Sequence, residues 1–282
     1  MYCGNCFRDN ALVAALREAG HEVTMIPLYL PFTLDEENQA GDTPIFYNGV
    51  NVYLEQKSAL YRAAPRWLHR VVGSDTMLGW AASQVGKTRA EEVGDLTISM
   101  LRGEEGHQAR ELEELIGWLK TQPKPHVISL SNSLLLGLAH RLKEAIGAPV
   151  VCLLQNEAPY IDSMPEEVRE EVWQIMAERA QEIDQFIAPS AFYAGRMRDK
   201  LNLTADRVQV IHNGINHDGY SAERVAPNPP VVGFFSRMCK DKGLDTLVDA
   251  FIKMKQDNHC LLYTSDAADD TPCVDLGGRR II

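Results

Sequence analysis

Two basic residues and a glycine stand where phosphate-binding groups occur in α/β proteins. Arg237, Lys242 and Gly243 separate an apolar run, VVGFF, from a helical pattern, GLDTLVDAFIKMK. A loop from a strand to a helix lies at the carboxyl end of the strand, where ligands bind, and free helix N–H groups attract anions. Arginine offers a fork of donors and lysine a point charge. The spacing therefore indicates an anion site; the alternative is a pair of solvated loop cations.

Cys3 and Cys6 form a C-x-x-C pair directly before the first helical pattern. A redox-active pair can occupy this position, and the same pair would also make half of a zinc site. The sequence has no second C-x-x-C and no H-x-x-x-H that would complete such a site. The third interpretation is two structural loop cysteines, and no metal site is predicted.

The helices that must position these residues are visible as apolar periodicities. NALVAALREAG predicts a helix that ends at Gly20, with Leu12, Ala15 and Leu16 on one face of the helix. Residues 56–104 are mostly helical and irregular in pattern. A second amphipathic pattern, HQARELEELIGWLK, has one apolar stripe. The stripe consists of Leu112, Leu115, Ile116 and Leu119. Trp67 and Trp80, within residues 56–104, are expected to pack against other residues.

Short apolar runs between the helical patterns predict strands. Residues 23–28 and 45–54 predict two strands near the start of the chain. Four further apolar runs follow at 126–130, 149–154, 185–189 and 208–212. Strands that alternate with helices at this spacing predict a parallel sheet covered on both faces, so the fold class is α/β.

The same series divides the chain into domains. Residues 1–220 are expected to form one α/β domain. The segment SAERVAPNPP, 221–230, is rich in proline and polar residues and predicts an interdomain linker. Residues 231–259 then begin a second domain with one strand and one helix. The helix has an apolar face formed by Leu244, Leu247, Val248 and Phe251.

Composition limits the class of protein and of partner. The 282 residues are 45% hydrophobic and 24% charged, which is ordinary for a soluble globular chain. A net charge of −11 gives no bias toward polyanions, so nucleic acid is not an expected partner. No apolar run is long enough to span a membrane, although peripheral membrane contact stays open. The start lacks the features of a signal peptide and the six cysteines form no disulfide framework, so a cytoplasmic location is expected.

The junction between the two expected domains resembles that of family 4 glycosyltransferases. Those enzymes have the GT-B architecture of two Rossmann-like domains. A strand ends there in an Asn-Gly-Ile/Val-Asp/Asn turn; a linker and a strand follow, and then Arg, four residues, Lys-Gly and a helix. The matching residues are Asn213, Gly214, Ile215, Asn216, Arg237, Lys242 and Gly243. Upstream stretches, among them CGNCFRDNALVAAL, LSNSLLLGLAHRL and IAPSAFYAGRM, extend the resemblance to most of residues 2–255 and point to a bacterial branch.

The resemblance implies a nucleotide-sugar donor as co-substrate and no separate cofactor. Arg237, Lys242 and Gly243 would bind the donor diphosphate, whose leaving group develops negative charge. A glycine-bearing loop before the first helix approaches the donor phosphates in the family, and Gly4 and Asn5 occupy that place. Asn213 and Gly214 would form the hinge between the domains.

The resemblance also marks the residues expected to contact the substrates. Many members carry a histidine after the strand that here reads VVCLL, but this chain has Gln155, followed by Asn156 and Glu157. Glutamine cannot act as a base, yet its amide can bind a sugar hydroxyl. Ser131 and Asn132, with Ser133, could face the acceptor, or one of Asn132 and Ser133 could cap a helix.

The reaction expected from the resemblance is transfer with retention, in which the donor phosphate serves as the base. The acceptor, a glycan, a lipid or a small molecule, stays unknown. Two alternatives remain, a GT-B nucleotide-sugar epimerase and a non-catalytic protein that binds a sugar or nucleotide.

Both ends of the chain carry further expectations. A parallel fold of this type should begin with a strand before the first helix, so a first strand is expected to be missing ahead of Met1. Residues 260–282 resemble a translation of transposon-derived sequencing adapter, because Cys260–Asp269 and Val274–Ile282 both read back as adapter codons. The acidic Glu-x7-Glu segment of the family does not occur in the remaining residues. The chain is therefore expected to be an inactive fragment of a longer transferase.

Overall fold

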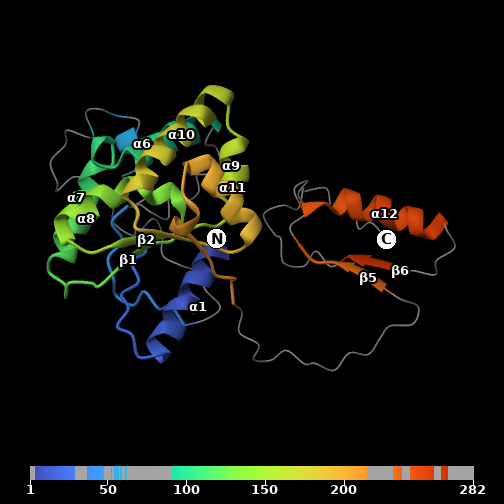
Figure 1. Ribbon diagram of the computed structural model, residues 1–282, viewed down its shortest axis with the longest axis horizontal. Coiled ribbons are helices and arrows are strands. Elements are labelled where there is room, and N and C mark those ends of the chain that lie inside the picture. The colour runs from blue at the N-terminus through green and yellow to red at the C-terminus, as the bar shows by residue number, and fades with distance from the viewer. Residues whose placement is uncertain are drawn as a thin grey trace. The chain divides into compact units, whose positions relative to one another are not determined.

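The computed structural model divides the chain into two compact units, Met1–Gly214 and Ile215–Ile282 (Figure 1). The structure describes residues 4–28, 37–47, 52, 54–56, 58, 61, 90–214, 231–236, 242–256 and 262–265. The expected linker, 221–230, and the two tryptophans Trp67 and Trp80 lie outside these ranges.

A parallel four-stranded sheet forms the centre of the first unit, with the strands in the order β1-β2-β3-β4. The strands are β1 Ile128–Leu130, β2 Val150–Leu153, β3 Gln185–Ala188 and β4 Val208–Val210. Each one lies within a predicted apolar run. The sheet and its crossovers confirm the α/β class and are consistent with a Rossmann-like fragment of GT-B type.

Helices connect consecutive strands of the sheet. They are η3 Ser133–Leu138 and α8 Ala139–Ile146 after β1, α9 Glu157–Asp162, α10 Glu166–Arg179 and η4 Ala180–Glu182 after β2, and α11 Ala191–Leu201 and η5 Ala205–Arg207 after β3. Ahead of β1 lie α6 Ala90–Arg102, η2 Gly103–Glu105 and α7 Ala109–Leu119. Because the strand order rises in one direction, right-handed crossovers place the connecting helices on one face of the sheet.

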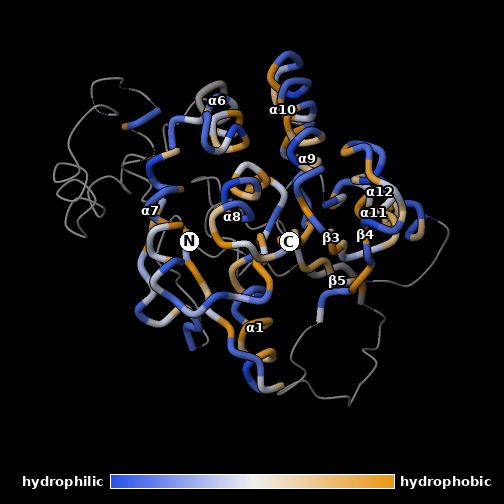
Figure 2. Tube along the Cα trace, turned by 60° about the vertical axis from the view of Figure 1, so that its left-hand side comes forward, coloured by the Kyte–Doolittle hydropathy of each residue, from blue (hydrophilic) through white to orange (hydrophobic). Residues whose placement is uncertain are grey.

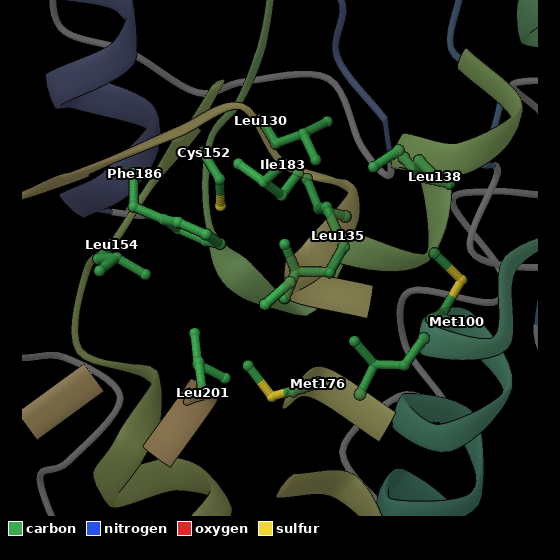
Figure 3. Close-up of a cluster of buried hydrophobic side chains, with 14 of the residues drawn as sticks. Met100, Leu130, Leu135, Leu138, Cys152, Leu154, Met176, Ile183, Phe186 and Leu201 are labelled. Atoms are coloured by element: carbon green, nitrogen blue, oxygen red, sulfur yellow. The ribbon is translucent and has the colours of Figure 1, made fainter. Parts of the chain in front are cut away.

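The main core lies between that face and the helices (Figure 3). Strand residues such as Leu130, Cys152 and Phe186 meet Met100 of α6 and Met176 of α10 there. Figure 2 shows the matching alternation of hydrophobic and hydrophilic residues along α10. The predicted stripe of α7 is confirmed, since its leucines and isoleucine are buried or packed against the same core.

The two faces of the sheet are covered to different extents. Burial alternates between buried and half-buried residues along β2 and β3. β1 and β4 each have one buried residue, and their other residues are half-buried or exposed. The described residues therefore cover the second face of the sheet less completely than the first. In Figures 1 and 2, α1, Gly4–Glu18, lies on the side of the sheet away from α6, α8 and α10.

The first helix ends as predicted. Gly20 follows α1 with a φ of 89°, a left-handed conformation that favours glycine. On the shared face of α1, Leu12 is 42% exposed, Ala15 is exposed and Leu16 is half-buried. Val13 is buried, in a small cluster with Met25 and Ala40 that is separate from the main core.

Neither of the first two predicted strands forms over the described residues. Residues 23–28 belong to no strand, and 45–47 are irregular, while 52 and 54–56 are helical. The Leu28 carbonyl accepts a hydrogen bond of 2.8 Å from the Tyr47 N–H. Among the described residues no ladder joins either segment to β1, and a strand needs a ladder partner to satisfy its backbone groups.

The second unit contains β5 Val231–Phe234, α12 Leu244–Gln256 and β6 Leu262–Ser265. Its first strand and its helix confirm the predicted pattern after the linker. β5 and β6 pair in parallel. β6 falls within the segment that resembles adapter sequence, and its pairing uses backbone groups that any sequence supplies. The origin of residues 260–282 stays a prediction.

Candidate functional site

The carboxyl ends of the parallel strands bring together the residues that follow them. Ser131 follows β1, Gln155 lies two residues after β2, and Ser190 caps the N-terminus of α11 after β3, where its side chain accepts from the Tyr193 N–H. Loops at this edge of an α/β sheet carry ligand sites. We call this group of loops the strand-end site.

Glu157 is the internal anchor of the strand-end site. Its side chain is 5% exposed. Its Oε1 accepts from the Ser133 N–H at 2.9 Å, and its Oε2 accepts from the Gln155 N–H at 2.9 Å and from the Tyr193 hydroxyl at 2.8 Å. One carboxylate thus joins the loop after β1, the loop after β2 and α11. Its role as a substrate contact stays a prediction, because the contacts observed are internal.

The surroundings of Glu157 disfavour further negative charge. Burial raises the pKa of the Tyr193 hydroxyl, and the neighbouring Glu157 carboxylate raises it further. Burial also raises the pKa of the Cys152 thiol, Glu157 adds to that effect, and Arg8 opposes it. Tyr193 and Cys152 therefore stay neutral at neutral pH.

The Ser131 carbonyl links α1 to the strand-end site. It accepts from the Gln155 Nε2 at 3.2 Å and from the Arg8 Nη2 at 3.4 Å. Arg8 also donates through Nε to Asp9 Oδ1 at 3.0 Å. Burial raises the pKa of the Asp9 carboxyl, and its hydrogen bond and ion pair with Arg8 oppose that rise. Arg8 and Ser131, which are 123 positions apart in the sequence, thus meet at one carbonyl oxygen.

Sequence reasoning missed Arg8. It lies one helical turn after Gly4, so the two positions share a face of α1, and the glycine was the residue singled out. A cation on the same face as a candidate phosphate-binding glycine was the available signal. The partner that fixes Arg8, a carbonyl far along the chain, could not be read from the sequence.

The remaining residues of the strand-end site are placed as follows. Asn132 accepts from the Leu134 N–H at 3.0 Å and caps η3, so the capping alternative describes its contact. Ser133 is buried and donates its N–H to Glu157, whereas Asn156 is exposed at the start of α9. Asn156 is therefore accessible to a ligand, and Ser133 is not.

Two of the predicted donor contacts lie in α1 rather than before it. Gly4 and Asn5 are in the first turn of that helix. Both residues therefore lie where the backbone N–H groups of a helix have no acceptor within the helix. Cys6 is half-buried in α1, and Cys3 lies outside the described residues.

The second unit holds the other predicted donor contacts. Gly243 has a φ of +71° and directly precedes α12, and its carbonyl accepts from the Leu247 N–H at 2.9 Å. Lys242 is exposed beside it. Arg237 lies outside the described residues, so this part of the prediction has no structural description. Asn213 and Gly214, the predicted hinge, are the last residues of the first unit.

A polar groove of about 620 Å³ lies away from the strand-end site. It is lined from α6, η2, α10 and η4, and paired charges occupy it: Arg102 Nη2 lies 2.7 Å from Glu171 Oε1. Both side chains are about half exposed, so water screens the pair. Within the described ranges no group of three metal-binding side chains is found, and no helix is long and apolar enough to cross a membrane.

Comparison with known protein families gives one match. The family model of Glycosyltransferase Family 4 matches residues 81–218. No curated protein matches the sequence significantly. The matched residues include the whole four-stranded sheet and the loops after β1, β2 and β3.

Proposed function

We propose that the chain derives from an enzyme of glycosyltransferase family 4, whose family model matches residues 81–218, and that this enzyme transfers a sugar from a nucleotide-sugar donor to an acceptor. The observation that carries this proposal is the coincidence of the family match with the strand-end site. The matched residues build that site, and its polar groups lie at the sheet edge where α/β proteins bind ligands.

The proposed donor contacts are on the second unit. Lys242 is exposed next to Gly243, and the left-handed glycine turns the chain directly into α12. A glycine at such a turn lets a phosphate approach the backbone N–H groups of the helix, and the lysine adds a positive charge. Arg237 is proposed as the second cation of this diphosphate site, and Gly4 and Asn5 as contacts from α1.

The proposed acceptor contacts are on the strand-end site. The Gln155 side chain uses Nε2 to bind the Ser131 carbonyl, which leaves its Oε1 as an acceptor for a sugar hydroxyl. Asn156 is exposed beside it. Glu157 is not suited to serve as a base, because three donors from the protein already bind its carboxylate. Retention with the donor phosphate as base is the mechanism we propose, since it requires no base from these loops.

The finer features of the reaction are also proposals. The nucleotide-sugar donor and an acceptor that is a glycan, a lipid or a small molecule rest on the resemblance, and the proposed cytoplasmic location rests on the sequence features given above. Residues 231–282 contain no glutamate and hence no Glu-x7-Glu segment to grip the donor sugar and ribose. We therefore propose that this chain binds a nucleoside diphosphate weakly and does not turn over a nucleotide sugar.

Ligand-observed NMR with a panel of uridine, guanosine and adenosine diphosphate sugars tests the proposal on the full 282-residue chain. Binding should weaken about tenfold in Lys242→Ala, which is the loss of a charge-assisted contact. It should not change in Lys253→Ala, a matched lysine in the last turn of the same helix. A chain that binds none of these ligands, or that binds them equally well in both variants, would contradict the donor site.

The products of a parallel incubation separate the alternatives. Unchanged ligand is expected. Release of a nucleoside diphosphate would overturn the proposed inactivity, and an epimerised sugar formed without an acceptor would favour a nucleotide-sugar epimerase. Tight binding that is insensitive to Lys242→Ala, with no turnover, would favour a non-catalytic binding protein.

A further inference from the structure

One face of the short helix α9 is exposed, and that face begins at the strand-end site. Burial along the helix follows the helical period. The buried residues are Glu157, Ala158 and Ile161. The exposed residues, at the start, in the middle and directly after the end of the helix, are Asn156, Tyr160 and Ser163. We call these three exposed residues the α9 face.

Asn156 occupies the N-cap position of α9 without capping it. Asparagine is favoured at this position because its side chain usually accepts from an N–H of the first turn. Here the Asn156 side chain makes no such bond. The Tyr193 hydroxyl takes its place, since it accepts from the Ala158 N–H at 3.2 Å while it donates to Glu157 Oε2 at 2.8 Å. The exposed amide of Asn156 can therefore serve a ligand both as a donor and as an acceptor.

Tyr160 presents an aromatic ring that is fixed at its far end. Its hydroxyl lies 3.1 Å from the Oγ1 of Thr97, a buried residue of α6. Tyr160 as a whole is nevertheless 38% exposed. Because the protein already binds the hydroxyl, the exposed ring offers an apolar contact to a ligand. A ring anchored in this way loses little freedom when a ligand packs on it.

The α9 face itself carries no charge. The charged residue at the end of the helix, Asp162, accepts from Trp173 Nε1 at 3.1 Å and forms an ion pair with Arg196. Glu157 is buried, and its carboxylate binds three donors of the protein. A phosphate or a carboxylate would find no positive side chain on this face, so the face favours a neutral ligand.

A pyranose ring matches the groups of this face. The C–H groups on one side of a sugar ring pack on the negative face of an aromatic ring, and the hydroxyls around it both donate to and accept from amides. Gln155, whose Nε2 binds the Ser131 carbonyl, adds a fixed amide oxygen at the start of the face. An alkyl chain would use the ring of Tyr160 and leave the amide of Asn156 without a partner.

We propose that the acceptor is a carbohydrate and that Tyr160 is a specificity-determining residue of its site. The Tyr160 ring stacks on the C–H face of a pyranose, Asn156 binds its hydroxyls, and Thr97 is a positioning residue that holds the aromatic ring. The inference rests on the proposed transferase function, and it narrows the acceptor from a glycan, a lipid or a small molecule to a glycan.

Saturation-transfer NMR on the full 282-residue chain tests this inference. The probes are the methyl glycosides of glucose, mannose, galactose and N-acetylglucosamine, with hexyl phosphate as the probe for a lipid headgroup. At least one glycoside should bind with a Kd of about 1 mM, and saturation should be strongest at the C–H protons of one ring face. Absence of binding by every glycoside at about 10 mM, or binding of hexyl phosphate alone, would overturn the inference.

Substitutions of aromatic residues locate the stacking contact. Tyr160→Leu keeps an apolar side chain but removes the ring, and it should weaken glycoside binding about tenfold. Tyr160→Phe keeps the ring and loses the bond to Thr97, so it should weaken binding only about threefold. The matched control is Phe192→Leu, at a residue of α11 that is 79% exposed, and it should leave binding unchanged. Equal losses in Tyr160→Leu and Phe192→Leu would overturn the inference.

Two asparagines separate a ligand contact from a structural one. Asn156→Ala should weaken glycoside binding about tenfold and leave the Tm unchanged, because its side chain caps no helix. Asn132→Ala should lower the Tm, because it removes the cap of η3. A fall in Tm for Asn156→Ala without a loss of glycoside binding would assign Asn156 a structural role and overturn the inference.

The donor experiment distinguishes a failure of this inference from a failure of the proposed function. If nucleotide-sugar binding depends on Lys242 but no glycoside binds, the carbohydrate acceptor alone is overturned. If neither kind of ligand binds, both proposals are overturned. If Tyr160→Leu weakens the binding of a nucleotide sugar and no glycoside binds, the ring belongs to the donor site, and the acceptor inference is overturned.

Discussion

Two buried carboxyl groups, those of Glu55 and of Glu111 at the start of α7, should make the stability of the first unit depend on pH. Glu55 is 1% exposed and Glu111 is 3% exposed. Burial, a hydrogen bond with Glu111 and the charge of Glu111 together raise the pKa of Glu55 to about 9, against the attraction of Arg110. The same surroundings raise the pKa of Tyr61 to about 12, through burial and the two carboxyl groups. We conclude that Glu55 is protonated at neutral pH and shares its proton with Glu111.

The sign of the pH dependence follows from the raised pKa. An unfolded Glu55 loses its proton near its ordinary pKa of 4.5, whereas the folded one keeps it to about 9. The folded state therefore holds one more proton between these values. Its stability is greatest below the lower value and falls by up to about 1.4 kcal/mol for each pH unit above it. From pH 6 to pH 8 the contribution of this group amounts to a loss of up to about 3 kcal/mol.

Glu55→Gln removes the titration and keeps a donor for Glu111. We expect its free energy of unfolding to be nearly flat where that of the unsubstituted chain declines, so that the variant is the more stable of the two at pH 8. Urea unfolding followed by circular dichroism at pH 6, 7 and 8 measures the two slopes. Glu18→Gln, at an exposed position of α1, is the matched control and should leave the slope unchanged.

Parallel stability profiles for the unsubstituted chain and Glu55→Gln would refute the shared proton. A profile that rises with pH in this window would refute the sign as well. An unchanged slope with a general loss of stability would show that the substitution acts through packing and not through ionisation.

Three further outcomes follow from the geometry. Gly137→Ala should lower the free energy of unfolding by about 1–3 kcal/mol, because the new Cβ would lie 2.2 Å from a backbone oxygen of α6. The control Gly117→Ala meets nothing within 4 Å and should be neutral or stabilising, and thermal unfolding of both variants measures the difference. Asn132→Ala should lose about 1 kcal/mol through the missing cap of η3, and Asn132→Asp should restore it, as measured by urea unfolding. Glu157→Gln should lower the free energy of unfolding by about 1–3 kcal/mol, because the NH2 group of the glutamine would lie against one of the three donors that bind the carboxylate. The backbone amide resonances of the loops after β1 and β2 should shift in its NMR spectrum. An unchanged spectrum would contradict the anchoring role of Glu157.

The sequence predicted the sheet where each strand could be recognised without knowledge of its neighbours. The runs at 126–130, 149–154, 185–189 and 208–212 are short, apolar and separated by helical patterns, so their pairing follows from crossover rules. The run at 23–28 has the same composition and forms no strand, because strand formation also depends on a partner. Its composition could not reveal that no ladder adjoins it among the described residues.

The candidate site was predictable to a similar extent. Gln155 and Ser131 were found because both follow strands, and the ends of parallel strands meet at one edge. Arg8 and Tyr193 were missed, because their importance arises from single contacts to distant residues, a carbonyl in one case and a carboxylate in the other. Hydrogen bonds across more than 30 residues leave no periodicity in a sequence.

The hydrogen bonds of Glu157 and the neutral amide of Gln155 limit the chemistry that the strand-end site can contribute. Its buried carboxylate, Glu157, is held by donors from three segments, and withdrawing it for proton transfer would leave those donors without a partner in a low-dielectric setting. Gln155 cannot accept a proton at neutral pH. The loops after β1 and β2 are thus suited to hold and orient an acceptor rather than to activate it. A proton acceptor for the proposed transfer then has to come from another group, and the phosphate of the donor is the one that the reaction itself supplies.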